Sequence, residues 1–291
     1  MNIHFIAIGG AVMHNMAICL SKSNNVSGSD DQIYEPSKSR LKKYNLLPEK
    51  LGWDISKITE KIDCVILGMH AKEDNPELMQ ARKLKIPIYS FPEYIAKHSV
   101  DKFKIVIAGS HGKTTISAMV LHVLNYHSRS IDFMLGGELA GYNNSVSLTE
   151  NNDFILLEGD EYLSSAIDSS RKFHHYKPQI ALISGISWDH VNVFKTLADY
   201  NKQFEIFIDS ITPGGVLVYN KEDRTLKAIV DASENTIRKS LDESQFVLKW
   251  DSTPTFISDG TIIPISILTY SEAVILMSTE AWSLPEPELE E

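Results

Sequence analysis

The segment that most constrains the fold of this chain is residues 105–120, which read IVIAGSHGKTTISAMV. A run of β-branched residues ends in a short turn between Gly109 and Gly112, and a helix-forming sequence begins at Lys113. A strand that enters a helix through such a turn directs backbone N–H groups and the positive end of the helix towards one point. The two glycines permit positive φ angles and the close approach of a bulky anion. The segment therefore predicts a phosphate-binding turn in an α/β fold.

The residues after the second glycine fit a nucleoside triphosphate with its metal ion. The Lys113 ammonium can reach β- and γ-phosphate oxygens, and a hydroxyl of Thr114 or Thr115 can bind Mg²⁺. The complete P-loop pattern has a glycine five residues before Gly112, where this chain has Ile107. The alternative is an ordinary strand-to-helix turn with a lysine on the surface.

Strand and helix patterns alternate on both sides of this turn. Strands are expected over 3–8, 25–28, 64–68, 86–90, 104–108, 153–158, 180–185 and 215–219. Helices are expected over 11–22, 36–45, 76–84, 113–126 and 197–210. Such alternation implies parallel sheets with helices on their faces. The polar segment 92–102 is expected to connect two halves of the chain, with a boundary near residue 100.

Length and composition limit the class of protein. The 291 residues exceed what one core usually serves, so two domains are expected. The net charge of −10 argues against nucleic-acid or anionic-membrane binding, but permits a local basic pocket for a phosphorylated small molecule. Cys19 and Cys64 lie in apolar runs, as expected of reduced thiols in the cytoplasm. No apolar run reaches the roughly 18 residues of a membrane span.

A second glycine turn follows the first expected strand. Gly9 and Gly10 precede a helix pattern, which suits a diphosphate at a helix N-terminus. The dinucleotide fingerprint G-x-G-x-x-G is broken by Ala7 and Val12, which disfavours a nicotinamide-dependent oxidoreductase. Asp30 lies about twenty residues further on, where a ribose-binding acid is found in dinucleotide sites. A solvated aspartate in a turn is the alternative.

One strand end supplies a group that suits a metal ion. Glu158 ends the apolar strand FILLE, so its carboxylate is expected beside the phosphate turn. With Thr114 or Thr115 it offers the hard oxygen ligands that Mg²⁺ prefers. Asp160 and Glu161 follow closely and are alternative ligands. His174 and His175 are expected in a loop, without a ligand role.

The turn GSHGKTT at 109–115 resembles the ATP loop of the Mur ligases, the ATP-dependent amide-forming enzymes of peptidoglycan assembly. Further segments agree in the family's order over residues 2–265: IAIGG at 6–10, GSD at 28–30, DNPE at 74–77, LEGDE at 157–161, SWDH at 187–190 and YNKED at 219–223. MHNMA and EGDEYLSSAID are more similar to the branch that joins UDP-N-acetylmuramate to L-alanyl-γ-D-glutamyl-meso-diaminopimelate. The alanine-adding branch is the alternative. Folate-polyglutamate ligases share the loop but lack an N-terminal sugar-nucleotide domain.

The resemblance implies a fold and a reaction. The fold would be α/β: a Rossmann-like UDP-sugar-binding domain at 1–98, an incomplete P-loop-type ATP-binding central domain at 99–267, a divergent tail at 268–291, and no third domain. In the family reaction, ATP phosphorylates the muramate carboxylate and the amine of a peptide or amino acid attacks the acyl phosphate. The partners would be UDP-N-acetylmuramate and that amine, with no nucleic acid or membrane.

The resemblance also implies site residues. ATP would lie on Gly109, Ser110, His111, Gly112, Lys113, Thr114 and Thr115. Mg²⁺ would be bound by Thr114, Thr115, Glu158 and His190, and the catalytic residues would be Lys113, Glu158 and His190. UDP-N-acetylmuramate would contact Ile8, Gly9, Gly10, Asp30, His70 and Asn75. A carbamylated lysine that supports the metals in several members corresponds to Phe204 here, and the nearest lysine is Lys202.

The resemblance ends near Leu268. ISDGTIIPISI resembles a hairpin that in the family continues into a segment near the nucleotide base, but this chain continues with LTYSEAVILMSTEAW. We therefore expect this chain alone to bind the sugar nucleotide with weak or no ligase turnover. A non-catalytic nucleotide-sugar-binding module is the competing interpretation.

Overall fold

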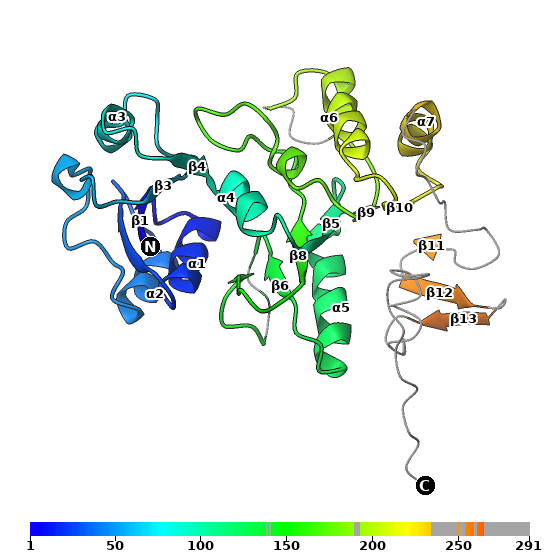
Figure 1. Cartoon of the computed structure of the whole chain (residues 1–291). Coiled ribbons are helices and arrows are strands. Elements are labelled where there is room, and N and C mark those ends of the chain that lie inside the picture. Colours follow the sequence, from blue (N-terminus) through cyan, green and yellow to red (C-terminus); the bar gives the residue numbers. More distant parts are fainter. Residues whose placement is uncertain are drawn as a thin grey trace, which may run out of the picture.

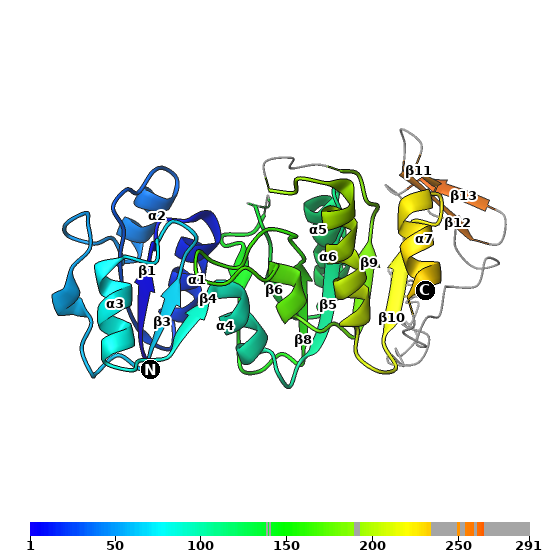
Figure 2. The same cartoon turned by 90° about the horizontal axis from the view of Figure 1, so that it is seen from above.

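The computed structural model describes residues 1–137, 139, 141–188 and 193–233, and the backbone of three short strands at 249–250, 254–258 and 261–264. Two parallel α/β units lie side by side along the molecule, and a small antiparallel sheet follows them (Figures 1 and 2). The expected α/β class is confirmed.

The N-terminal unit is built on a four-stranded parallel sheet of order β2-β1-β3-β4. Its strands are β1 (Asn2–Ile6), β2 (Asn25–Ser29), β3 (Cys64–Leu67) and β4 (Ile88–Ser90). Its helices are α1 (Ala11–Leu20), α2 (Ser37–Lys43), α3 (Pro76–Lys83) and α4 (Phe91–His98), with a 3-10 turn η1 (Ile55–Lys57). Every residue of β3 is buried, as expected of a strand covered by helices on both faces.

The central unit has a six-stranded sheet of order β10-β9-β5-β8-β6-β7. Its strands are β5 (Phe103–Ala108), β6 (Asp132–Met134), β7 (Val146–Ser147), β8 (Phe154–Glu158), β9 (Ile180–Ile183) and β10 (Val216–Tyr219). Its helices are α5 (Lys113–Tyr126), α6 (Leu197–Asp209) and α7 (Arg224–Ala232), with a 3-10 turn η2 (Lys172–His175). Only the edge strand β7 is antiparallel to its neighbour. β5 lies between β8 and β9, and the carboxyl end of such a central strand is where α/β sheets bind ligands.

The third sheet consists of β11 (Lys249–Trp250), β12 (Pro254–Ser258) and β13 (Thr261–Pro264). β12 and β13 form an antiparallel hairpin in which Ser258 pairs with Thr261, which confirms the hairpin expected in ISDGTIIPISI. The tail expected at 268–291 lies outside the described residues.

The polar segment 92–102 connects β4 to β5 as expected, but most of it forms a helix that was not expected, because α4 occupies Phe91–His98. Ser90 and Glu93 form a capping box at its start, in which the Ser90 N–H donates to Glu93 Oε2 at 2.6 Å. Phe91 and Ile95 are buried against the core. The strands β6 and β7 and the helix α7 were not expected either, and each is short.

The two units meet where α1 and α2 approach the loop around β7. The Leu148 N–H donates to the Cys19 sulfur at 3.2 Å, and the Asn144 amide donates to the Asn15 carbonyl at 2.9 Å. The Arg40 guanidinium donates to the Asn143 carbonyl at 2.5 Å. Both cysteines are free and buried, as expected, and burial raises the pKa of Cys64 to about 11.

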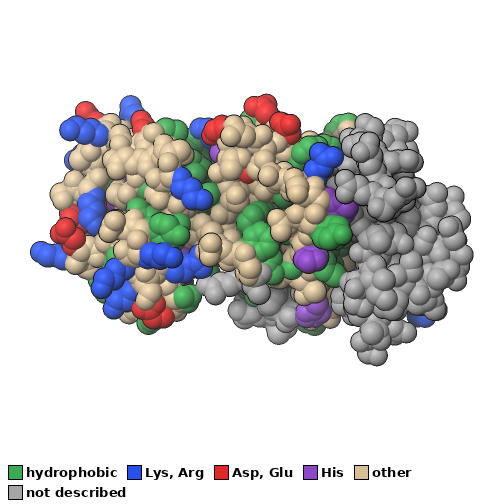
Figure 3. All heavy atoms as spheres, turned by 90° about the horizontal axis from the view of Figure 1, so that it is seen from below, with side chains coloured by type: hydrophobic (Ala, Val, Ile, Leu, Met, Phe, Trp, Pro, Cys, Tyr) green, Lys and Arg blue, Asp and Glu red, His purple; other side chains and the backbone are tan. Residues whose placement is uncertain are grey.

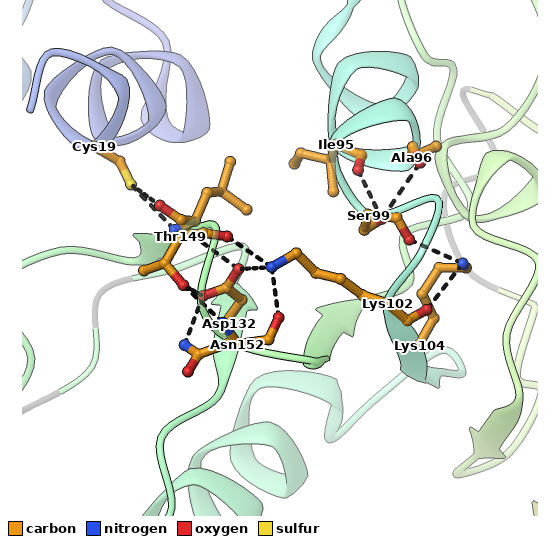
Figure 4. A network of polar contacts seen from close by, with 10 residues as sticks. Cys19, Ile95, Ala96, Ser99, Lys102, Lys104, Asp132, Thr149 and Asn152 are labelled. Carbon is orange, nitrogen blue, oxygen red and sulfur yellow. Dashed lines mark hydrogen bonds and ion pairs between the residues drawn. The ribbon is translucent and has the colours of Figure 1, made fainter. Parts of the chain in front are cut away.

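A buried polar cluster reinforces this junction (Figure 4). Asp132 is fully buried and accepts from the Lys102 ammonium at 2.9 Å, the Thr149 N–H at 2.9 Å and the Asn152 amide at 2.8 Å. Lys102 also donates to the carbonyls of Thr149 and Asn152, both at 2.6 Å. The segment that enters β5 is thereby fixed to β6 and to the loop that reaches Cys19.

The surface is uneven in charge. Figure 3 shows lysine and arginine side chains gathered over the N-terminal unit, although the whole chain is acidic. The last turn of α2 contains three cationic residues, Arg40, Lys42 and Lys43. Among the described residues, no helix combines the length and apolar character that a membrane crossing requires.

Candidate functional site

The turn between β5 and α5 has the predicted conformation. Gly109 has a φ of 120° and Gly112 a φ of 80°, both in the left-handed region that glycine favours. The Ser110 N–H donates to the Gly185 carbonyl at 2.9 Å, and the Ser184 hydroxyl donates to the His111 carbonyl at 2.5 Å. Ser184 and Gly185, which follow β9, therefore hold the turn in place through hydrogen bonds.

Substituting Gly109→Ala is expected to destabilise the chain. An added Cβ would collide with the Ser184 hydroxyl and would lie 2.9 Å from Ser184 N, and the positive φ adds backbone strain. We expect a loss of about 2 kcal/mol in the free energy of unfolding, measured by urea denaturation. Gly137→Ala is the matched control, because nothing lies within 4 Å of its added Cβ. Equal stability of the two variants would contradict the strain assigned to Gly109.

Thr114 and Glu158 meet at the carboxyl ends of β5 and β8. The Thr114 hydroxyl donates to Glu158 Oε1 at 2.9 Å, and the Gly136 N–H donates to Glu158 Oε2 at 2.9 Å. Glu158 is 8% exposed, so its carboxylate is held at the edge of the site rather than in bulk solvent. A hydroxyl and a fixed carboxylate together are the oxygen donors that suit Mg²⁺.

Lys113 lies beside the same strand ends. Its ammonium donates to the Gly109 carbonyl at 2.7 Å and pairs with Glu161 Oε2 at 3.2 Å. His111 and Thr115 are exposed at the turn. The structure thus brings Lys113, Thr114 and Glu158 together. His190 lies outside the described residues, so its expected place at this site stays a prediction.

No lysine on α6 takes the place of the family's carbamylated lysine. Phe204 is fully buried and packs edge-to-face against Tyr200 and Phe173. Lys202 points outwards, with 61% of its side chain exposed and an ion pair to Glu205. A carbamate at either position is therefore not available to the site.

At the N-terminal turn, Gly9 and Asp30 are joined directly. The Gly9 N–H donates to Asp30 Oδ2 at 2.7 Å, and Asp30 is 2% exposed. Burial raises the pKa of Asp30, and the Gly9 hydrogen bond opposes that rise. Ala7 has a φ of 66°, the conformation for which the dinucleotide fingerprint has glycine. Asp30 therefore holds the turn, and its contact with a ribose stays a prediction.

The remaining residues expected to bind the sugar nucleotide differ in their surroundings. The side chain of Ile8 is fully buried, while Gly10 is half-buried where α1 begins. His70 is exposed beyond the end of β3. Asn75 caps α3, accepting from the N–H groups of Glu77 and Leu78, both at 3.0 Å. The structure shows a capping function for Asn75 that the sequence analysis did not assign.

Two site residues were not expected from the sequence. Tyr200 lies in the helix expected over 197–210 and was given no place at the site, yet its hydroxyl contacts Ser110 and Glu161 at 2.7 and 3.2 Å. Asp223 caps α7 and accepts from the Ile186 N–H at 2.5 Å, which fixes the segment after β9. The capping pattern at Asp223 was readable in the sequence, whereas the contact of Tyr200 required the fold.

A separate group lies between α4 and η2. Among the described residues, Glu93, Asp168 and His175 place potential ligand atoms within 4.8 Å of one another. These atoms are already engaged: Glu93 caps α4, and His175 Nε2 lies 3.1 Å from Asp168 and 2.8 Å from the Ser164 hydroxyl. The group is a structural contact between the two units.

The sheet order and the turn at 109–115 are those of a P-loop-type α/β protein, and a second glycine turn lies in an attached Rossmann-like unit. A family model described as the Mur ligase middle domain matches residues 107–267, and one described as the Mur ligase family catalytic domain matches residues 2–102. The chain belongs to the Mur ligase family.

Individual relatives agree with this assignment. The chain is 29% identical over 229 residues to the UDP-N-acetylmuramate–L-alanyl-γ-D-glutamyl-meso-2,6-diaminoheptandioate ligase of Escherichia coli, covering 78% of this chain and 50% of that protein. It is 31% identical over 253 residues to the UDP-N-acetylmuramate–L-alanine ligase of Persephonella marina, covering 86% and 52%. The chain spans about half the length of the curated relatives it matches.

A solved structure supports the fold. The crystal structure of the UDP-N-acetylmuramate:L-alanyl-γ-D-glutamyl-meso-diaminopimelate ligase from Neisseria meningitides superposes with a TM-score of 0.77 and 26% sequence identity. The match covers 90% of this chain and 85% of that one. The resemblance stated from the sequence is therefore confirmed at the level of family and fold.

Proposed function

We propose that this chain is the sugar-nucleotide-binding and ATP-binding part of an ATP-dependent peptidoglycan ligase. The observation that carries the proposal is the convergence of Lys113, Thr114 and Glu158 at the carboxyl ends of β5 and β8. ATP would bind at residues 109–115, and UDP-N-acetylmuramate would bind at the N-terminal turn. The domain limits 1–98 and 99–267 are part of this proposal.

The chain's own groups suit phosphoryl transfer, which depends on positioning and charge neutralisation. The N–H groups of the turn and the Lys113 ammonium would hold the phosphates. Thr114 and Glu158, with Thr115 and His190, would hold Mg²⁺, which when bound neutralises phosphate charge. The muramate carboxylate would be brought to the γ-phosphate from the N-terminal unit, and an amine would then replace the phosphate.

The amine acceptor we propose is the tripeptide, with L-alanine as the alternative. Relatives named for each acceptor match this chain at similar identity, and both names include UDP-N-acetylmuramate. A cytoplasmic location is proposed from the two buried free thiols and from the phosphorylated substrates.

Calorimetric titration of this chain with Mg-ATP and, separately, with UDP-N-acetylmuramate tests the proposal. Binding of both ligands, with acyl-phosphate formation when they are combined, supports a ligase half-reaction. Binding of the sugar nucleotide alone supports the non-catalytic module instead. If neither ligand binds, the proposed function is wrong.

Substituting Glu158→Gln is expected to remove most of the Mg²⁺ dependence of ATP binding. The amide keeps the size of the side chain but loses the charge that attracts the cation. We expect the affinity gained from Mg²⁺ to fall by about tenfold, measured by titration with and without the ion. Glu205→Gln on the exposed face of α6 is the control. An unchanged Mg²⁺ effect in Glu158→Gln would exclude Glu158 as a ligand.

A further inference from the structure

The ion pair between Lys113 and Glu161 joins the phosphate turn to the interior of the central unit. Glu161 is fully buried, and only 14% of the Lys113 side chain is exposed. The Lys113 ammonium contacts Glu161 Oε2 and the Gly109 carbonyl, so it rests on oxygen atoms of the protein itself. A phosphate group that binds the Lys113 ammonium therefore has to displace the Glu161 carboxylate from it.

A series of hydrogen bonds leads to the Glu161 carboxylate. Which group donates in each bond follows from the protons that each group carries. An ionised carboxylate only accepts, so the Tyr200 hydroxyl donates to Glu161 Oε1 at 3.2 Å. The Ser110 hydroxyl then donates to the Tyr200 oxygen at 2.7 Å, and Ser110 Oγ accepts from the Ser187 N–H at 2.8 Å. The hydrogen-bond series therefore runs from the segment after β9, through Ser110 in the turn and Tyr200 on α6, to Glu161.

The Tyr200 ring is fixed independently of its hydroxyl. It packs edge-to-face against Phe194 and Phe204, with ring centroids 4.8 and 5.3 Å apart, and is fully buried. Its hydroxyl can therefore hold the Glu161 carboxylate in a defined place.

We propose that Glu161 is a resting counter-ion that competes with phosphate for Lys113, and that Tyr200 is the positioning residue that holds it there. This inference rests on the proposed function, because it describes how the same ATP site is regulated. The attraction between opposite charges is strong in a secluded site, so exchanging Glu161 for phosphate lowers the net affinity for ATP. The alternative is that Glu161 is a Mg²⁺ ligand.

ATP titration in EDTA and in Mg²⁺ separates these two functions. Glu161→Gln keeps an acceptor for Tyr200 but removes the competing charge, so ATP binding in EDTA is expected to become about tenfold tighter. Glu205→Gln is the control, since it makes the same substitution on an exposed pair. Unchanged or weaker binding in EDTA, or a loss seen only with Mg²⁺, overturns the inference. Failure of the wild-type chain to bind ATP overturns the proposed function as well.

Tyr200→Phe tests the positioning function, because it keeps the packed ring and removes only the hydroxyl. With Glu161 less firmly held, ATP binding in EDTA is expected to tighten about two- to threefold. The effect is expected to vanish in the Glu161→Gln background, since Tyr200 acts through that carboxylate. An equal effect in both backgrounds overturns this function. If circular dichroism shows that Glu161→Gln does not fold, the single variant Tyr200→Phe still decides, because unchanged or weaker binding in EDTA then overturns the inference.

Discussion

Substituting Lys113→Ala is expected to weaken ATP binding by about a hundredfold, because removing one partner of a secluded charged contact costs roughly 2–5 kcal/mol. The ammonium lies at the carboxyl end of β5, where the turn directs its N–H groups, and it is the charge most able to reach the phosphates. The affinity is measured by calorimetric titration with Mg-ATP. UDP-N-acetylmuramate affinity is expected to stay unchanged, since the N-terminal turn belongs to the other unit.

Lys202→Ala is the matched control for this experiment. Lys202 lies on α6 with 61% of its side chain exposed, so removing it subtracts the same charge without touching the turn. Lys113→Ala also leaves the buried Glu161 without this cation, so urea denaturation of the variant is measured as well to check that it is folded. A folded Lys113→Ala variant that binds ATP like the wild type would show that the turn is not the phosphate site.

Substituting Asp132→Ala is expected to lower the free energy of unfolding by about 3–5 kcal/mol, because it leaves the Lys102 cation buried without an anion. Lys102 is 9% exposed, and its remaining contacts are two carbonyl oxygens. The Thr149 and Asn152 donors also lose their acceptor. Urea denaturation followed by circular dichroism measures the change.

The double variant Lys102→Met/Asp132→Leu is the test of that reasoning. Apolar residues of similar size remove both charges at once, so the double variant is expected to be more stable than Asp132→Ala. If the double variant loses more stability than Asp132→Ala, the cost comes from packing rather than from an unpaired charge. Glu150→Ala, on the same loop, controls for loss of an acidic residue at the surface.

The order of strands and helices could be predicted because apolar runs and glycine turns mark it directly. The strand before Gly109 and the helix after Gly112 were expected within a residue of their positions in the structure. The helix α4 was missed because polar residues dominate 92–102, although Ser90 and Glu93 carry a capping box. The strand β6 has three residues, too few for a periodic pattern.

The site was predictable where a strand end fixes the side chain. Glu158 follows from the apolar run FILLE and lies where it was expected, bonded to Thr114. The hydrogen bond from Tyr200 to Glu161 could not be predicted from the sequence, because it joins residues 39 positions apart. Asp30 is a different case. Its place after the second strand was expected, but its burial and its hydrogen bond to Gly9 were not, because the spacing of residues does not show how the turn packs.

The contacts of Cys19, Asn15 and Arg40 with the loop around β7 have a consequence for the proposed reaction. They set the separation of the two glycine turns before any ligand arrives. When ligands occupy both turns, little further entropy is lost in positioning their reacting groups relative to one another. Under the proposed function, the junction fixes the distance over which the sugar nucleotide has to reach the ATP site, and loosening it is expected to slow acyl-phosphate formation even where each ligand still binds.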